Sequence, residues 1–325
     1  MCEVVKSTFE YHFPIIEASI RKADFIAIDT EFTGLDIDEK CQGSLFDTSE
    51  ERYAKLRKNV SQFTLSQIGL AIFTKVPDEN VYQVETFNMP LLAMAFGSLD
   101  VCFSLQTSSL NFLCTHNFDF NKFIYEGVPF MNEEQETQTK KQISGGTLFN
   151  GVQRKVDEEE VQNVCSCVAE WIANSKAEQK FIFKKTEGMK QIRDYVLHIE
   201  LRNRFPSIWT ATDPDGDLLI EKVTNERRQE LEIENIEMKK QYEKELLETL
   251  LGFTRVFRVL QECKKPLVGH NLLTDLLFLY QKFHKPLPAS ENEQRYRRLA
   301  SAFYREGWRE PTSILSSGPC PEKGG

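Results

Sequence analysis

The spacing of apolar residues in the first part of the chain predicts one helix followed by a small sheet. Apolar side chains recur at helical intervals over 8–22, and the β-branched and aromatic segment 24–32 is typical of a buried strand. Two further strand-like runs, 62–76 and 81–92, are separated by Pro77-Asp78-Glu79-Asn80, a sequence that favours a tight turn. We therefore expect a hairpin beside the first strand, within an α/β fold.

A second group of elements, in the middle of the chain, predicts a separate small domain. Residues 138–155 are rich in Gln, Lys, Ser and Gly, a composition typical of a linker. Amphipathic helices are predicted over 156–174 and 189–204, and two short strands over 209–223 around the turn Asp213-Pro-Asp-Gly216. This arrangement predicts a small α+β domain inserted into the larger fold.

The remaining segments return the chain to the first domain. Residues 226–248 are dense in both charge signs and lack helix breakers, which favours a solvated connecting helix. A short strand at 265–268 and a strongly apolar helix at 272–283 follow, as in a buried part of an α/β domain. The predicted divisions are 1–150 (first part of the core), 151–223 (insert), 224–290 (connecting helix and second part of the core) and 291–325 (disordered or divergent tail).

Composition and charge narrow the classes of function. The chain of 325 residues carries a formal net charge of -9, which argues against a non-specific coating of nucleic acid, because phosphate contacts need clustered Lys and Arg. Its 8 cysteines are scattered without a Cys-x-x-Cys pair, which favours a reducing compartment, the cytoplasm or also the nucleus. The longest apolar run, 89–96, is far shorter than a membrane span, and no secretory signal opens the chain. We expect no membrane segment, and only local contacts with RNA.

Two carboxylates on the first predicted strand are candidates for a metal site. Asp29 and Glu31 stand at positions i and i+2, so both project from one face of the strand while Thr30 points to the other. Neighbouring carboxylates in an apolar strand repel each other and lose hydration, a cost that a divalent cation removes. Hard oxygen ligands suit Mg²⁺, or Mn²⁺ in its place, better than Zn²⁺. The alternative is a pair of solvated acids at a strand end.

A third carboxylate follows the predicted strand at 265–268. Asp275 lies in the first turns of the next helix, close to the strand ends where α/β sheets usually build their sites, and is a candidate ligand of a second metal ion. Asn271 suits the N-cap of that helix. His270 is available as a base, but a turn histidine held by the backbone is the better interpretation.

Several motifs together resemble one group of nucleases. Ile28-Asp-Thr-Glu-Phe-Thr-Gly34 and Gly269-His-Asn-Leu-Leu-Thr-Asp275 resemble the first two motifs of the DEDD exonuclease superfamily. The stretches that resemble its poly(A)-specific ribonuclease (PARN) family, and within it the branch that trims piRNA 3′ ends, are Ser44–Tyr53, Gln67–Gly69, Phe118–Phe123, Gly127–Gln135, Pro206–Trp209 and Lys265–Asn271. The resemblance spans roughly residues 5–290.

The resemblance implies a ribonuclease H-like fold and hydrolysis that releases mononucleotides from the 3′ end of single-stranded RNA, either a poly(A) tail or a piRNA precursor. Asp29 and Glu31 would hold one Mg²⁺, and Asp29 with Asp275 the other. The family commonly forms homodimers, so a homodimer is expected. A DNA proofreading exonuclease is the weaker interpretation, because the stretches around Tyr53 and Asn121 are of the deadenylase type, and we expect no action on DNA.

In this family the insert is a small RNA-binding domain with an Arg-x-x-x-His motif, whereas Arg193 and His198 here are one position too far apart. The candidates for RNA contact are the cationic residues that gather near aromatic side chains of the insert: Arg193, Arg202, Arg204, Lys184 and Lys185. Together with Phe181, Phe183 and Trp209 they suit backbone contact and base stacking. An ordinary charged surface over an aromatic core explains the same residues equally well.

The family's fourth carboxylate lies on a later helix, together with a histidine that serves as general base. Here Asp275 is the last aspartate and His284 the last histidine. We expect the resemblance to stop after Ser290, as in a C-terminally truncated product that lacks the membrane anchor of the piRNA-trimming relatives. Hydrolysis is then expected to be impaired, and the alternative function is that of a catalytically inactive RNA-binding or partner-binding isoform.

Overall fold

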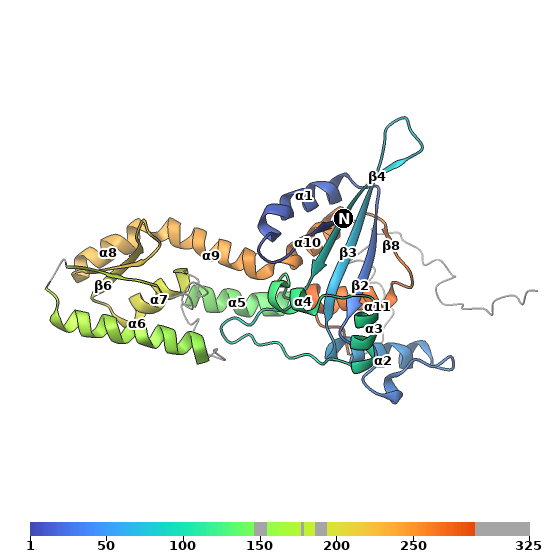
Figure 1. Ribbon diagram of the computed structural model, residues 1–325, viewed down its shortest axis with the longest axis horizontal. Coiled ribbons are helices and arrows are strands. Elements are labelled where there is room, and N and C mark those ends of the chain that lie inside the picture. The colour runs from blue at the N-terminus through green and yellow to red at the C-terminus, as the bar shows by residue number, and fades with distance from the viewer. Residues whose placement is uncertain (146–154, 177–178, 186–193, 290–325) are drawn as a thin grey trace, which may run out of the picture.

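The computed structural model describes residues 1–145, 155–176, 179–185 and 194–289. They form a larger α/β region and a smaller α+β region at opposite ends of an elongated molecule (Figure 1). Two helices run between them, α5 (Glu133–Gly145) and α9 (Ile236–Leu251). The predicted tail at 291–325 lies outside the described residues.

The larger region is built on a mixed five-stranded sheet in the order β1-β4-β3-β2-β8. Its strands are β1 (Cys2–Glu3), β2 (Phe25–Phe32), β3 (Leu65–Lys75), β4 (Tyr82–Pro90) and β8 (Leu267–Val268). β2, β3 and β4 pair antiparallel, whereas β8 is parallel to β2 and β1 is parallel to β4. The predicted strands, the hairpin and the α/β class are confirmed, with boundaries that differ by a few residues. This order places β2 and β8 side by side, although they are far apart in the sequence.

One face of the sheet is apolar because alternate residues of its strands are apolar. Ile26 and Ile28 of β2 are buried, as are Ile68 and Leu70 of β3, with the period of two that a strand imposes. Thr30 is also buried and continues the β2 series. The Thr30 side chain therefore lies on the core side of β2, next to the hydrophobic core.

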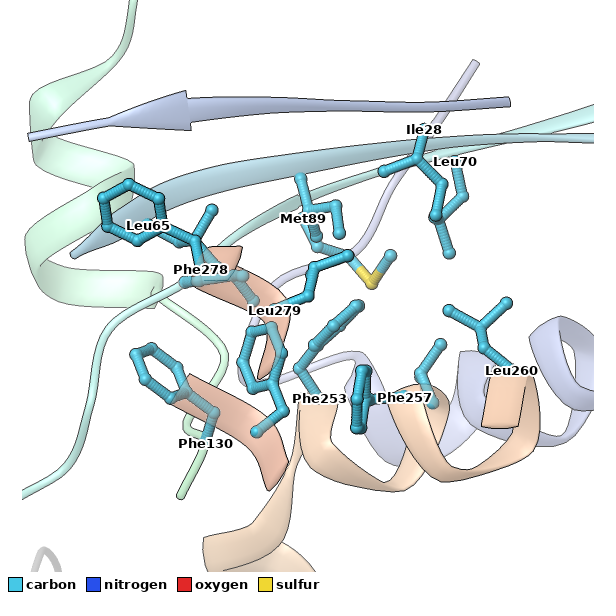
Figure 2. Packing of buried hydrophobic residues seen from close by; sticks show 14 of the residues in the cluster. Ile28, Leu65, Leu70, Met89, Phe130, Phe253, Phe257, Leu260, Phe278 and Leu279 are labelled. Atoms are coloured by element: carbon cyan, nitrogen blue, oxygen red, sulfur yellow. The ribbon is translucent and has the colours of Figure 1, made fainter. Parts of the chain in front are cut away.

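Helices α1 (Phe9–Lys22), α10 (Phe253–Cys263) and α11 (Leu273–Leu279) contribute buried side chains to this core. Aromatic rings from α10 and α11 lie beneath the sheet in Figure 2, where the labelled ones are Phe253, Phe257 and Phe278. The predicted helices over 8–22 and 272–283 are confirmed, although the second ends in a π-helical turn over Tyr280–His284.

Three helices of the larger region are not predicted by the apolar pattern: α2 (Ser49–Gln62), α3 (Thr107–Thr115) and α4 (Phe120–Glu126). α2 begins at a capping box, in which the side chains of Thr48 and Glu51 each accept from the other's backbone N–H. The backbone N–H of Gln106, just before α3, donates to the carbonyl of Thr33 at 2.8 Å. That bond ties the start of α3 to the segment that follows β2.

The smaller region comprises α6 (Lys155–Asn174), β5 (Lys180–Phe183), α7 (Asp194–Arg204), β6 (Ile208–Thr212) and β7 (Leu218–Lys222). Its strands form an antiparallel sheet in the order β5-β7-β6. The two predicted helices and the predicted strand pair are confirmed where residues are described, whereas β5 was not predicted. Val164, Leu201 and Ile220 lie in a hydrophobic cluster that is distinct from the core of the larger region.

The two connecting helices take part in this second cluster. Ile143 of α5 and Leu246 and Leu250 of α9 are buried in it. The predicted linker at 138–155 is therefore wrong over 138–145, where the polar sequence continues α5 and one apolar side chain anchors the helix. The domain divisions themselves stay predictions.

The predicted connecting helix at 226–248 is in fact two helices, because the chain bends at Asn235 between α8 (Asn225–Glu234) and α9. A second bend follows at Gly252, which has a φ of +43° and lies against the carbonyl of Pro129, where a Cβ would overlap that oxygen. None of the described helices is both long and apolar enough to span a membrane.

Candidate active site

The first part of the site lies near the end of β2. Asp29 is exposed and stands opposite Gly69 of β3, and Glu31 is half-buried. Burial raises the pKa of Glu31, and the negative charges of Asp29 and Asp275 raise it further. The predicted pair of carboxylates is therefore coupled through charge to the third candidate.

The second part of the site depends on a close approach between backbones. A Cβ at position 269 would lie 2.7 Å from the carbonyl oxygen of Ile28, so only glycine lets the turn after β8 pass beside β2. Asn271 has a φ of 52°, and the helix begins later with Leu272 as N-cap and no side-chain cap bond. The expected capping role of Asn271 is therefore wrong, since this residue provides a left-handed turn instead. His270 is exposed.

Asp275 is held in place by Thr30. The Thr30 hydroxyl donates to Asp275 Oδ1 at 2.5 Å, and Asp275 is only 8% exposed. Burial raises the pKa of Asp275, the Thr30 hydrogen bond opposes that shift, and the charge of Asp29 adds to it. The Thr30 hydroxyl thus orients the buried Asp275 carboxylate next to the strand that carries Asp29 and Glu31.

The donor chemistry of Asp29, Glu31 and Asp275 suits a metal ion, but their spacing is wider than a metal site requires. Burial and neighbouring negative charge raise the pKa of Glu31 and of Asp275, and such hard carboxylates fit a divalent cation, because bound positive charge relieves both repulsion and desolvation. Within the described ranges, no three His, Cys, Asp or Glu side chains are gathered closely enough to hold a metal ion. Asp29, Glu31 and Asp275 therefore stay a predicted ligand set, whose donor chemistry fits Mg²⁺ or Mn²⁺.

Two basic residues of the larger region, His116 and Lys282, were not singled out in the sequence, and the first of them acts on Glu31. The charge of His116, directly after α3, lowers the pKa of Glu31, and its Nδ1 lies 2.9 Å from the carbonyl oxygen of Phe112. Lys282 lies on the π-helical turn, where burial lowers its pKa to about 8, with Nζ 6.0 Å from the centre of the Phe278 ring. Neither has a sequence signal, because both are placed by helices whose packing is set by distant residues.

The structure separates the predicted RNA-contacting residues of the insert. Arg202 lies beside β6, whereas Lys184 and Lys185 follow β5 at the opposite edge of the sheet. Arg204 forms an ion pair with Glu200 at 2.5 Å. The fifth candidate, Arg193, lies outside the described residues. Arg202 lines a pocket together with Thr210 of β6 and Tyr242 of α9.

The aromatic residues of the insert have a structural role. Trp171 and Phe181 stack with ring centres 5.7 Å apart, and both pack with Phe183 against the hydrophobic cluster of the smaller region. Trp209 is buried. These rings therefore form part of an aromatic core, which is the alternative that the sequence left open.

An antiparallel three-stranded sheet extended by a parallel strand, with acidic residues on its first long strand and on the helix after the parallel strand, is the ribonuclease H-like arrangement. The model of the CAF1 family ribonuclease matches residues 4–304. The chain belongs to that family, and the expected family resemblance is confirmed. The match continues past Ser290, so the expectation that the resemblance stops there is wrong.

Three relatives illustrate the relationship. The chain is 35% identical to the mouse poly(A)-specific ribonuclease PNLDC1 over 90% of its own length and 54% of that protein's. It is 34% identical to the pre-piRNA 3′-exonuclease trimmer of Bombyx mori, covering 89% of the chain and 53% of the trimmer. It is 30% identical to the human poly(A)-specific ribonuclease PARN, with 90% and 48% covered. The chain spans about half the length of the curated relatives it matches.

Among solved structures, the S. pombe Pop2p in its Mg²⁺- and Mn²⁺-bound form is similar over 45% of this chain and 53% of that chain. The sequence identity is 21% and the TM-score is 0.30. Such a likeness does not bear on the chemistry of the site.

Proposed function

We propose that this chain carries three of the metal-binding carboxylates of a 3′→5′ exoribonuclease that acts on single-stranded RNA ends. The observation that carries the proposal is the hydrogen bond from Thr30 to Asp275, which ties α11 to the strand that carries Asp29 and Glu31, in a chain of the CAF1 ribonuclease family. The names of its relatives support two substrates, a poly(A) tail and a piRNA precursor.

The side chains of the site have distinct roles in this proposal. Asp29 is exposed, whereas Glu31 is half-buried and Asp275 is buried, and these three carboxylates would hold the divalent cation. Thr30 fixes the orientation of Asp275 through its hydroxyl. A divalent cation bound by these carboxylates would lower the pKa of an attacking water and neutralise charge on the scissile phosphate.

We further propose that the polypeptide of residues 1–325 hydrolyses RNA slowly by itself. It holds no aspartate after Asp275 and no histidine after His284, and the loss of a general base typically costs roughly 10²- to 10⁴-fold in rate. An RNA-binding or partner-binding role without hydrolysis is the second candidate. His116 is the first residue to mutate if hydrolysis is fast, because its charge acts on Glu31.

The deciding experiment has two readouts on the same protein. Thermal melting is followed as Mg²⁺ or Mn²⁺ is added, and we expect a rise in Tm at millimolar metal, because binding to the native state alone stabilises it. A time course on 5′-labelled oligo(A) then compares this chain with one extended by the His/Asp helix of a relative. An unchanged Tm contradicts the metal site, and equal rates for the two chains contradict the proposed impairment.

The cellular setting is also a proposal. Seven free cysteines among the described residues support a reducing compartment, and we propose the cytoplasm, with the nucleus as the alternative. A homodimer is proposed from the family resemblance alone. Light scattering at micromolar concentration tests it, and a monomeric mass contradicts it.

A further inference from the structure

The outer edge of β4 is only partly covered by another strand. β4 spans Tyr82–Pro90, whereas β1, its neighbour on that side, pairs only with Phe87 and Asn88. In the described part of the chain, residues 82–85 of β4 therefore have no strand beside them on the outer side, and we call them the open edge. Figure 1 shows this end of the β3–β4 hairpin standing clear of the helices.

The backbone hydrogen bonds show which groups of the open edge point outward. The N–H of Val4, just after β1, donates to the carbonyl of Asn88 at 2.8 Å, so Asn88 directs its backbone groups away from β3. Backbone groups alternate sides from one residue of an antiparallel strand to the next. Tyr82 and Val84 therefore also direct their N–H and C=O groups outward. No hydrogen bond from another described residue reaches these groups on the outer side.

The open edge lacks the features by which proteins usually protect a free strand. The pairing of β3 with β4 begins with Lys75 opposite Tyr82 and continues without a register shift, so no bulge twists the edge away. Residues 82–85 read Tyr-Gln-Val-Glu and contain neither lysine nor proline. A regular, unprotected edge of this kind is a template for a further strand.

One face of the open edge is apolar and exposed. Tyr82 and Val84 are 46% and 44% exposed. Phe73 lies opposite Val84 in the sheet and Phe25 lies opposite Phe73, so all four side chains share one face. The Tyr82 ring lies 5.3 Å from the Phe25 ring. An apolar side chain of an added strand would extend this aromatic group and remove apolar surface from water.

The other face of the open edge and the adjoining turn are acidic. Glu85 is half-buried and points to the face opposite that of Val84. Asp78 and Glu79 are exposed in the turn between β3 and β4. Residues 75–86 contain one cation, Lys75, against these three acids. Charge complementarity therefore favours a basic segment at this edge over an acidic one.

We propose that the open edge binds an extended segment of a partner protein, in which apolar residues alternate with lysine or arginine. The segment adds a strand beside β4, and its backbone pairs with the outward N–H and C=O groups of Tyr82 and Val84. Its apolar side chains pack on these two residues, and a basic side chain pairs with Glu85. In such strand addition the main-chain hydrogen bonds give affinity and the alternate side chains give specificity. The site is independent of the proposed hydrolysis of RNA.

The test uses the full chain and two short synthetic peptides. Valine and lysine alternate in the first, and glutamate replaces each lysine in the second. Fluorescence anisotropy of the labelled peptides measures binding, and we expect binding of the lysine peptide alone. The proposal is overturned if the lysine peptide does not bind, or if the glutamate peptide binds equally well.

Amide hydrogen exchange locates the bound peptide. Exchange should slow at Tyr82 and Val84, whose N–H groups face outward, because an added strand would bond them. Gln83 faces β3 and is already part of the sheet, so its exchange should change little. Equal slowing at all three amides, or none at Tyr82 and Val84, contradicts strand addition.

One pair of variants tests the backbone contact. Val84→Pro removes an outward N–H, a change that an edge strand tolerates, and should weaken binding of the lysine peptide by about 2- to 10-fold. Val84→Thr keeps the N–H and the β-branched shape and should bind nearly as well as the wild type. Equal binding by Val84→Pro and the wild type overturns the proposal. Melting temperatures establish folding, and if Val84→Pro does not fold, the exchange pattern and the charge variants decide.

A second pair of variants tests the charge. Glu85→Lys places like charges on neighbouring strands and should weaken binding of the lysine peptide by about 3- to 10-fold. Glu237→Lys makes the same charge change on α9 and should match the wild type. Equal weakening by both variants would mean that the peptide responds only to net charge, and it would overturn the assignment to β4.

Light scattering of the protein alone tests the other occupant of the edge, a second copy of this chain. We expect Val84→Pro to leave the mass of the wild type unchanged. If the wild type is a dimer that Val84→Pro converts to a monomer, the open edge is an interface between two copies, and the proposed partner segment is overturned.

Discussion

The two ends of the molecule differ both in charge and in how their sites are assembled. In the larger region, Thr30 of β2 and Asp275 of α11 are joined by a hydrogen bond although they are 245 positions apart. In the smaller region, Arg202 of α7 lines a pocket together with Lys239 of α9. This comparison shows that the acidic site depends on packing between distant parts of the chain, whereas the pocket lies between the smaller region and α9. It also predicts that the two sites respond independently to mutation.

We expect the largest effect on metal binding from removing one carboxylate of the site. Asp29→Ala should abolish the Mg²⁺-induced rise in Tm and lower any Mg²⁺-dependent hydrolysis by at least about 10²-fold, because even outer partners of metal ligands typically cost 10- to 100-fold. Oligo(A) binding in EDTA should not weaken. Asp100→Ala, which removes an exposed aspartate of the same region, is the control. Equal melting curves for both variants in Mg²⁺ would refute the site.

The joint between the two regions should be sensitive to one methyl group. Gly252→Ala places a Cβ against the Pro129 carbonyl at a positive φ, so we expect a loss of about 2–4 kcal/mol of unfolding free energy. Urea denaturation measures it. Gly43→Ala has no atom within 4 Å of the added group and should change stability far less. A loss of equal size in both variants would mean that the bend at 252 is not strained.

Lys282 provides a pH-dependent test inside the larger region. Burial lowers its pKa from 10.5 to about 8, so the native state binds fewer protons than the unfolded state between these values. Wild-type stability should therefore rise as pH increases from about 8 to 10.5. Lys282→Met removes the cost of the buried charge and should be more stable than wild type at pH 7 by about 1–3 kcal/mol, a gain that disappears near pH 10.

Lys285→Met is the control for this experiment, since Lys285 is exposed and close to Glu133 at 3.2 Å. It should show no gain at pH 7 and no change of slope between pH 8 and 10. A gain in both variants would point to a general effect of lowering positive charge rather than to burial of one ammonium.

Asp275 gives the smallest effect and the one most specific to the carboxylate site. Burial raises its pKa, so the native state binds more protons just above the ordinary pKa of 3.8, and wild-type stability falls as pH rises through that window. Asp275→Asn keeps an acceptor for Thr30 and should be slightly more stable than wild type at pH 7 without metal. The advantage should vanish at acidic pH and reverse in Mg²⁺. A variant that still responds to Mg²⁺ like wild type would exclude Asp275 as a ligand.

The elements with strict periodicity are those that the sequence predicts well. β2, β3 and β4 are rich in β-branched and aromatic residues, and a turn sequence separates β3 from β4. Their predicted boundaries differ from the observed ones by only a few residues. α2 and α3 were missed because their apolar faces are narrow and their ends are fixed by capping and by the bond to Thr33. α5 was taken as a linker because one buried residue, Ile143, is too little for a pattern.

The candidate site follows the same division. Asp29, Glu31 and Asp275 are recognisable from motif and spacing, and the structure couples them electrostatically. The partnership of Thr30 with Asp275 was not predicted, because the strand pattern alone places Thr30 away from the acids and the position of α11 is set by packing. The pocket on α9 is equally hidden, since its two walls meet only after the bend at Asn235.

The separation of β2 from β8 along the chain has a consequence during translation. The edge of β2 that β8 later covers stays unpaired until the ribosome has made the insert and both connecting helices, and an unpaired edge invites aggregation. The nascent polypeptide therefore needs protection of that edge over a long interval of synthesis.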